Sequence, residues 1–482
     1  MTDEDVLDSG RAGGMAIRGG LLRTGSYVAA LLLSLISVPF MTRHLGVADY
    51  GQFVTVSAIV FIIGGITEAG LTNLGTREYS VLAAAERDAF LRNLTGLRFV
   101  LTATGVVAAT GILFLTGAEG VLVVGTLIAG AGLLVSLVQQ TYAIPLSARL
   151  RLGWVSGLEL LKQALLAASI LALVAAGAGL VPFFATTIAS GVGVLAVTLI
   201  VIRHEAPLLP AADLASWRRI LREVLPYAAA AAVGLVYFRL AVILMSYVAS
   251  DYQTGIYSTA FRVVEAVGVV PWLVVSAGFP ILARAARDDP ERLRYALQRL
   301  FEVSLIVGGG FALALALTAE FAIEVIGGLP EFEDAVPVLR VLAAALVTAF
   351  LVATWSLALL SLRRHRELLV ANALAATVAA VGTVVLASQF GAMGAAVATL
   401  TAEAVLAAAY LIALRRSHRH LTPRSGVVPK VLLAGGVGVA AALIPAHPLI
   451  QGLAGTFAFA VVLFSLGAVP HELLNALRGR DP

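Results

Sequence analysis

The chain has 482 residues, of which 60% are hydrophobic and only 13% charged, and its mean hydropathy is +0.95. A soluble domain carries roughly 25% charged residues because its surface must stay hydrated, so this composition excludes a large soluble domain. The net charge of +4 is typical of arginine-anchored cytoplasmic loops in a membrane protein, and the absence of cysteine excludes disulfides and thiolate metal sites.

Apolar stretches long enough to cross a bilayer, about 20 residues each, follow one another with short polar breaks. Residues 1–18 are polar and are expected to form a cytoplasmic segment, and the first apolar run is too long for a signal-peptide core. The sequence therefore predicts an all-α polytopic membrane protein of about fourteen transmembrane helices. These are expected at 19–41, 51–70, 97–116, 121–143, 155–178, 180–202, 227–248, 256–282, 300–319, 337–362, 368–387, 392–414, 431–444 and 449–466.

The basic residues predict the orientation of these helices. If the N-terminus is cytoplasmic and the helices alternate, the positive-inside rule holds in every loop, with Arg98 counted in a cytoplasmic one. Arg43 and Arg340 then fall outside. We therefore expect a multi-pass protein of the cytoplasmic membrane with both termini in the cytoplasm, the C-terminal one within residues 469–482.

The pattern predicts two halves. Residues 203–226 combine apolar and basic residues at helical spacing, which is typical of an amphipathic helix on the cytoplasmic interface. They would join an N-lobe at 19–202 to a C-lobe at 227–414, with the last two helices at 415–468. Short motifs recur between the lobes, and Leu146-Ser-Ala-Arg149 has a counterpart in Leu360-Ser-Leu-Arg363. Six helices per copy would make the lobes parallel pseudo-repeats.

Three stretches carry a family resemblance that spans nearly the whole chain. They are residues 43–53 (RHLGVADYGQF), 221–226 (LREVLP) and 255–262 (GIYSTAFR). In these the chain resembles the polysaccharide (O-antigen type) flippases of the multidrug/oligosaccharidyl-lipid/polysaccharide (MOP) exporter superfamily. The resemblance implies movement of a polyprenyl-(pyro)phosphate-linked oligosaccharide from the inner to the outer leaflet. It also implies glycosyltransferases or a polymerase of the same pathway as candidate partners, with no nucleic acid and no cofactor.

Several cations fall inside or at the edge of the membrane helices, where a charge costs at least about 2.5–3.5 kcal/mol. Arg262 and Arg239 are expected at a similar depth near the outer side, and two guanidiniums suit capture of a pyrophosphate. Lys162 is a candidate second phosphate contact, and Arg23 a weaker one. Pairing with a carboxylate is the alternative explanation, by Glu265 for Arg262 and by Glu159 for Lys162.

Five acidic residues remain as candidates for ion coupling or for charge pairing with an arginine. They are Glu265, Glu159, Glu302, Glu403 and Glu68. Their spacing does not suggest a metal site, and the sequence does not choose among them.

Two other functions compete with the flippase. An ion-coupled multidrug or organic-cation antiporter would keep the fold, but it needs an anionic, aromatic-lined pocket, which embedded arginines disfavour. A membrane-embedded polysaccharide polymerase or ligase would need catalytic groups on a large outer loop, and the outer loops are short. A transporter that is not an enzyme remains the leading hypothesis.

Overall fold

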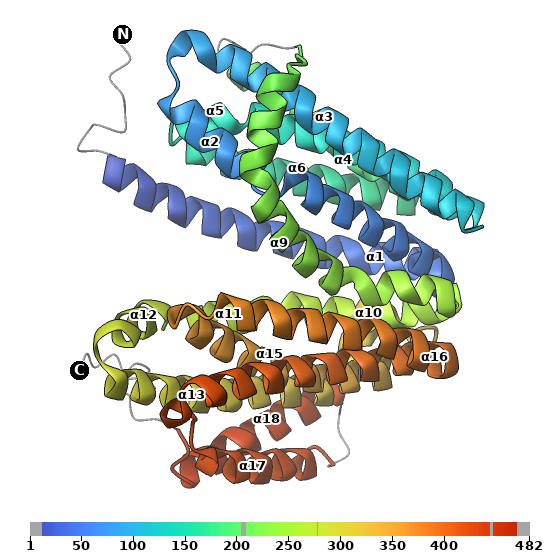
Figure 1. Cartoon of the computed structure of the whole chain (residues 1–482). Helices are drawn as coiled ribbons and strands as arrows, with labels where there is room; N and C mark the ends of the chain where they lie inside the picture. Colours follow the sequence, from blue (N-terminus) through green and yellow to red (C-terminus); the bar gives the residue numbers. More distant parts are fainter. Residues whose placement is uncertain (1–11, 204–208, 277, 444–446, 470–482) are drawn as a thin grey trace. The chain divides into compact units, whose positions relative to one another are not determined.

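A computed structural model describes residues 12–203, 209–276, 278–443 and 447–469, and every regular element in these ranges is a helix (Figure 1). Ten of the described helices are long and apolar enough to cross a membrane. Most of the expected segments 1–18 and 469–482 lie outside the described residues.

Fourteen spans follow from these helices once two bends are counted. The long helices α1 (Ala12–Glu68) and α16 (His365–Ser417) each contain one non-helical glycine, Gly46 with φ 72° and Gly391 with φ 54°. A side chain strongly disfavours such φ values, so glycine lets each helix reverse direction with almost no loop. Each therefore covers two expected spans, and the shorter apolar helices Arg239–Val248 and Ser425–Ala441 supply the remaining two. The predicted fold class is confirmed.

The chain divides into two compact units, residues 1–239 and 240–482. In the first unit α1 packs against α6, and α4 packs against both α3 and α8. Its core is a set of interhelical clusters, one of them centred on Val56 and Phe184. After α1 the helices are α2 (Leu71–Val81), α3 (Ala84–Leu115), α4 (Gly120–Tyr142), α5 (Ile144–Ala148), α6 (Leu152–Ala175), α7 (Leu180–Phe184), α8 (Thr186–Ile202) and α9 (Leu214–Val248), which crosses the boundary between the units.

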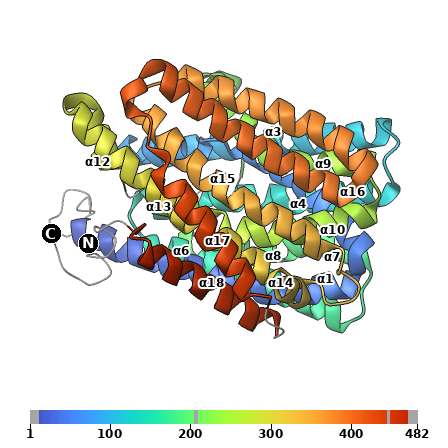
Figure 2. The same cartoon turned by 90° about the horizontal axis from the view of Figure 1, so that it is seen from below.

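In the second unit α15 is the central helix, packed against α10, α13 and α16, and 50% of its most apolar window is buried. The two last helices, α17 and α18, pack on each other and on α13 (Figure 2). The helices are α10 (Asp251–Val267), α11 (Val269–Ser276), α12 (Phe279–Asp288), α13 (Pro290–Leu317), α14 (Ala319–Ile326), α15 (Ala335–Ser361), α16, α17 (Val428–Ala441) and α18 (Pro448–Ser465), with 3-10 turns η2 (Arg419–Leu421) and η3 (Ser425–Val427).

The turns before α6 and before α16 are built alike. Leu150 and Arg363 are the described non-glycine residues with positive φ, at 54° and 56°, a conformation uncommon for residues with a side chain. The amide of Arg151 donates to the Leu146 carbonyl, and that of Arg364 donates to the Leu359 carbonyl, both at 2.8 Å. Leu146 therefore corresponds to Leu359, one residue earlier than the motif comparison placed its partner.

The segment that leads into α9 is docked on the first unit. The Ala211 amide donates to the Arg92 carbonyl at 2.9 Å, and the Trp217 indole donates to the Asn93 carbonyl at 3.0 Å. A Cβ on Gly96 would lie 2.1 Å from the Ala211 carbonyl oxygen, so only glycine permits this approach. Further along α9, Ile220 and Val224 are buried in the cluster of α2, α3 and α5. The apolar face of this stretch thus packs against protein.

Candidate functional site

A buried ion pair joins four helical segments in the first unit. Arg98 on α3 is fully buried and binds Glu68 at the end of α1. Its guanidinium also donates to the hydroxyls of Thr72 at 2.6 Å and Thr141 at 2.9 Å. The Thr72 amide donates to the second Glu68 oxygen at 3.2 Å. A charge that has left water needs such partners, so this network explains Glu68.

Arg98 lies on a helix that is longer than expected. It was counted with a cytoplasmic loop, and α3 begins at Ala84, before the start expected at residue 97. Arg98 therefore lies within the candidate span Ala85–Leu115. The signal that was missed is Glu68 itself, since an acid in a membrane helix calls for a cationic partner.

A polar cavity of about 540 Å³ lies beside this network. It is bounded by α2, the end of α4, α5 and the start of α6, and Thr72 belongs to both the cavity and the Arg98 network. Amides and hydroxyls dominate its polar lining, while Arg77 and Glu159 supply charge. The lining residues are Thr72, Asn73, Thr76, Arg77, Gln139, Gln140, Ala143, Ser147, Leu152, Val155, Leu158 and Glu159.

Lys162 and Glu159 do not form the pair that their spacing suggests. Glu159 is exposed and lines the cavity, whereas Lys162, one turn further along α6, is half-buried. No carboxylate among the described residues lies within ion-pair distance of Lys162. Its charge is therefore not neutralised by Glu159.

Arg239 lies over an aromatic ring. Its guanidinium carbon is 4.8 Å from the ring centroid of Phe61 on α1, a cation–π geometry, and the side chain is half-buried. Arg23 is part of α1, but its side chain lies outside the part of the structure that is described.

Two ion pairs of the second unit each lie within a single helix. Arg262 and Glu265 on α10 form an ion pair of 3.2 Å, and their side chains stay 41% and 21% exposed. Arg299 and Glu302 on α13 form one of 2.8 Å. Each is an i,i+3 pair, the spacing at which helical neighbours meet. Glu403 is half-buried on α16.

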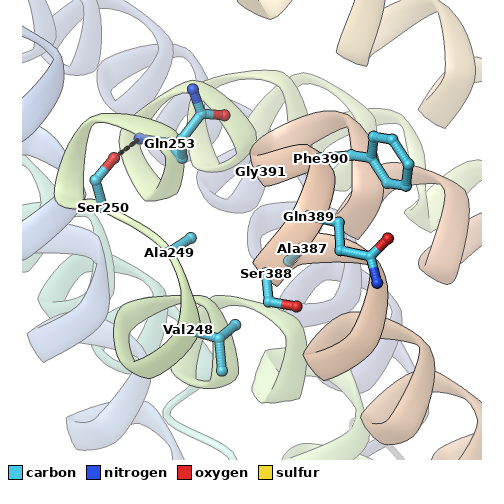
Figure 3. Close-up of a pocket in the computed structure, with 9 residues that line it drawn as sticks. All are labelled: Val248, Ala249, Ser250, Gln253, Ala387, Ser388, Gln389, Phe390 and Gly391. Atoms are coloured by element: carbon cyan, nitrogen blue, oxygen red, sulfur yellow. Dashed lines mark hydrogen bonds between the residues drawn. The ribbon is translucent and has the colours of Figure 1, made fainter.

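A neutral polar cavity of about 580 Å³ lies where α9 gives way to α10 and where α16 bends (Figure 3). The Gln253 side-chain oxygen accepts from the Ala392 amide at 2.7 Å and so ties α10 to the bend. Ser250 caps α10 by accepting from the Gln253 amide at 3.3 Å. Ser388 and Gln389 add further polar side chains. None of the charged candidate residues lies here.

Within the described ranges, no group of three or more His, Asp or Glu side chains is placed to hold a metal ion. The embedded charges therefore form two sets. One is an interhelical network around the buried Arg98 in the first unit, and the other consists of half-exposed arginines that keep part of their surface accessible.

Comparison with known proteins adds a family and a fold. Residues 16–286 match the family described as polysaccharide biosynthesis protein, which is more than half of the chain. No curated protein sequence matches the chain.

Several solved structures are similar over most of their length. The lipid II flippase MurJ in an inward closed conformation is 13% identical with a TM-score of 0.72, covering 92% of this chain and 98% of that one. A multidrug resistance MATE family transporter of the MOP superfamily is 16% identical in its inward-facing conformation, with a TM-score of 0.60 over 83% of this chain and 98% of that one. An outward-facing conformation of a multidrug resistance MATE family transporter is also 16% identical, with a TM-score of 0.51 over 84% of this chain and 96% of that one. The chain therefore belongs to the polysaccharide biosynthesis protein family and has the multi-pass membrane fold of the MOP superfamily transporters and flippases.

Proposed function

We propose that this protein is a flippase of the cytoplasmic membrane. It moves a polyprenyl-(pyro)phosphate-linked oligosaccharide from the inner to the outer leaflet, for synthesis of a cell-surface polysaccharide. The head group crosses through the protein by alternating access while the polyprenyl chain stays in lipid, and no covalent chemistry is involved. Both termini lie in the cytoplasm in this proposal, as the distribution of arginines indicates.

The accessible guanidinium of Arg262 carries the proposal. Arg262 lies about 17 Å along α10 at 1.5 Å per residue, within the candidate span Asp251–Ser276, yet its side chain is 41% exposed. A cation at that depth is costly unless it faces water or an anionic ligand. The planar fork of donors in a guanidinium matches a phosphate in bidentate geometry, as it does a carboxylate.

Arg239 and Lys162 are proposed as further phosphate contacts. The Phe61 ring stabilises the Arg239 cation through its quadrupole. Lys162 has no carboxylate partner among the described residues and stands one turn from the polar cavity of the first unit. Amides and hydroxyls such as those of Gln139 and Gln140 match the donors and acceptors of sugar hydroxyls.

An organic-cation antiporter is the alternative that the MATE likeness keeps open. Such a site needs uncompensated negative charge and free aromatic faces. Here Glu68, Glu265 and Glu302 each bind an arginine, and the Phe61 ring already carries Arg239. Those acids are therefore better placed to hold arginines than to bind a drug cation.

A polymerase or ligase is disfavoured by the outer connections. In the described residues α1 and α16 reverse at single glycines, and only Ala249 and Ser250 separate α9 from α10. These connections leave no room for a catalytic domain on that side.

The test is appearance in the outer leaflet of a fluorescent polyprenyl-pyrophosphate oligosaccharide in proteoliposomes. We expect transport by the wild type and a rate at least about tenfold lower in Arg262→Gln, because a hydrogen bond to a charged group contributes roughly 1.5–3 kcal/mol. Arg364→Gln is the matched control. Arg364 forms an i,i+3 pair with Glu367 at 2.9 Å and is 39% exposed, so its loss removes an equivalent pair at the start of α16.

Equal rates in Arg262→Gln and Arg364→Gln would remove Arg262 from the site. A wild type that moves no lipid-linked sugar, but expels organic cations under a proton or Na⁺ gradient, would replace the flippase with the antiporter.

A further inference from the structure

A second charged cavity lies at one end of α13, α17 and α18, and its lining contains none of the proposed phosphate contacts Arg262, Arg239 and Lys162. Its volume is about 560 Å³. The lining contains three cations and one carboxylate, together with an aromatic ring. The residues that line it are Tyr295, Gln298, Arg299, Glu302, Arg424, Gly426, Val427, Lys430, Gly467, Ala468 and Val469.

The carboxylate in this cavity is already engaged. Glu302 accepts from Arg299 at 2.8 Å and from the Gln298 amide at 2.8 Å. The Lys430 ammonium donates to the carbonyls of Leu466 and Gly467 at 2.9 and 3.4 Å, where it caps the C-terminus of α18. Arg424 is exposed at the mouth. The charge of the lining is therefore positive, and anions are its natural ligands.

Hydrogen bonds fix the conformation of the chain segment around Arg424, which lines the cavity. The Arg424 amide donates to the Gln298 side-chain oxygen at 2.7 Å, and the Gln298 side-chain amide donates back to the Arg424 carbonyl at 3.2 Å. This reciprocal pair fixes the turn before α17 onto α13. Arg299 is steadied further by the Tyr295 ring, whose centroid is 5.1 Å from the guanidinium carbon. Arg299 and Lys430 are therefore held in place before an anion binds, and such preorganised cations lose little conformational entropy on binding.

The surroundings of the cavity select the kind of anion. Leu432 and Leu433, just past Lys430 on α17, are 70% and 56% exposed, and Phe464 near the end of α18 is 53% exposed. Positive charge and exposed apolar side chains thus meet within about one helical turn. A soluble phosphate would contact only the cations, whereas a lipid with an anionic headgroup would contact both the cations and the apolar side chains.

We propose that this cavity binds the phosphodiester headgroup of an acidic glycerophospholipid. Arg424, Arg299 and Lys430 hold the phosphate, and the acyl chains lie along the apolar surface of α17 and α18. The site shares no residue with the proposed phosphate contacts, so the protein would carry a bound membrane lipid in addition to its substrate.

The experiment measures lipid binding to the purified full chain by native mass spectrometry. Phosphatidylglycerol is titrated against phosphatidylcholine with the same acyl chains, and inorganic phosphate is added in a separate arm. We expect one phosphatidylglycerol to bind at least about tenfold more tightly than phosphatidylcholine. Millimolar inorganic phosphate should not displace it, because free phosphate gains nothing from the apolar surface.

Three variants locate the binding. Arg424→Gln removes one cation and should weaken phosphatidylglycerol binding several-fold. Gly426→Leu keeps every charge, and a Cβ at Gly426 meets no atom within 4 Å, so a leucine fits at this position of the lining and should obstruct binding. Arg366→Gln is the matched control, since Arg366 is also an exposed arginine of this unit but does not line the cavity.

Equal binding of the two lipids, or an equal loss in Arg424→Gln and Arg366→Gln, would overturn the proposal. If inorganic phosphate alone displaced the lipid, the cavity would be a site for a soluble anion, and the proposal that it binds a phospholipid would be wrong. Thermal unfolding of each variant without added lipid shows that a lost lipid does not reflect a lost fold.

Discussion

The two units treat charge inside apolar helices in opposite ways. In the first unit, Arg98 is fully buried and reaches Glu68 from a different helix, with two threonine hydroxyls completing its hydrogen bonds. In the second, Arg262 and Arg299 pair with glutamates three residues along the same helix and remain 41% and 36% exposed. The first arrangement ties helices together. The second joins residues of a single helix and leaves part of each guanidinium exposed.

This difference separates stability from function. Removing one partner of a buried pair strands a charge away from water and costs about 3–5 kcal/mol. Exposed pairs of this kind contribute only a few tenths of a kcal/mol. A membrane arginine held by a half-exposed pair therefore adds little to folding, and in our proposal it is retained because it binds the substrate.

The largest effect on stability should come from Glu68→Gln. This substitution leaves the Arg98 cation buried without a counter-charge. We expect the free energy of unfolding to fall by about 3 kcal/mol, the low end of the range for a broken buried pair, because the Glu68 side chain is 29% exposed. Unfolding of the purified protein in detergent measures it.

Arg98→Met serves as the control for that prediction. It leaves only the partly solvated Glu68 behind and removes the buried charge itself, so it should destabilise the protein less than Glu68→Gln. The interpretation of this network is wrong if the two variants rank the other way.

A smaller loss is expected at the bend of α16. Gly391→Ala puts a side chain on a residue with φ 54° and a Cβ 2.2 Å from the Gln253 side-chain oxygen, which already accepts from the Ala392 amide. Strain and the displaced hydrogen bond together should cost about 2 kcal/mol.

Gly117→Ala in the first unit measures the backbone strain separately from the lost hydrogen bond. Gly117 also has a positive φ, 72°, but a Cβ there meets nothing within 4 Å. We expect a loss of about 1 kcal/mol in the free energy of unfolding from the backbone conformation alone. Equal losses at the two glycines would show that the contact with Gln253 is unimportant.

Arg262→Gln should barely change stability, by less than about 0.5 kcal/mol, although it should slow transport. Measuring both quantities on one preparation sharpens the comparison between the units. A loss of stability comparable to that of Glu68→Gln would make Arg262 a structural residue after all.

The smallest effect is a pH dependence at His418, just after α16. Burial, with His420 and Arg364 nearby, lowers the pKa of His418 below its ordinary value of 6.5. The unfolded chain then takes up this proton at a higher pH than the folded protein does, so stability falls as the pH drops from 6.5 through the lowered pKa. Above pH 6.5 both states are neutral and the effect is absent. His418→Gln should flatten this part of the stability profile, and an unchanged profile would contradict the assignment.

The helices were predictable because apolar length alone specifies a membrane span. The bends at Gly46 and Gly391 mark the limit of that reasoning. A hydropathy pattern shows where two spans meet, but it does not show whether a loop or a single glycine joins them. The start of α3 was placed too late for the same reason, since α3 begins at Ala84 with polar residues that hydropathy assigns to a loop.

The site was predictable only where partners are neighbours in sequence. Arg262 and Glu265 pair as their spacing suggests, whereas Glu159 and Lys162 have the same spacing and do not. Side-chain direction decides between these outcomes, and it depends on surrounding helices. Glu68 and Arg98 lie on different helices, so no periodicity connects them, and the cavity beside them exists only because α2, α4 and α6 meet.

The docked approach to α9 has a consequence for experiments on motion. The backbone of Ala211 lies against Gly96, and the Trp217 indole is hydrogen-bonded to Asn93. A spectroscopic probe on this segment would therefore report the motion of the first unit and not an independent motion of the segment. The chain contains no cysteine, so thiol labels introduced here and on α10 would report without background from native thiols. A label near Trp217 is thus a fixed reference point for distance measurements during a transport cycle.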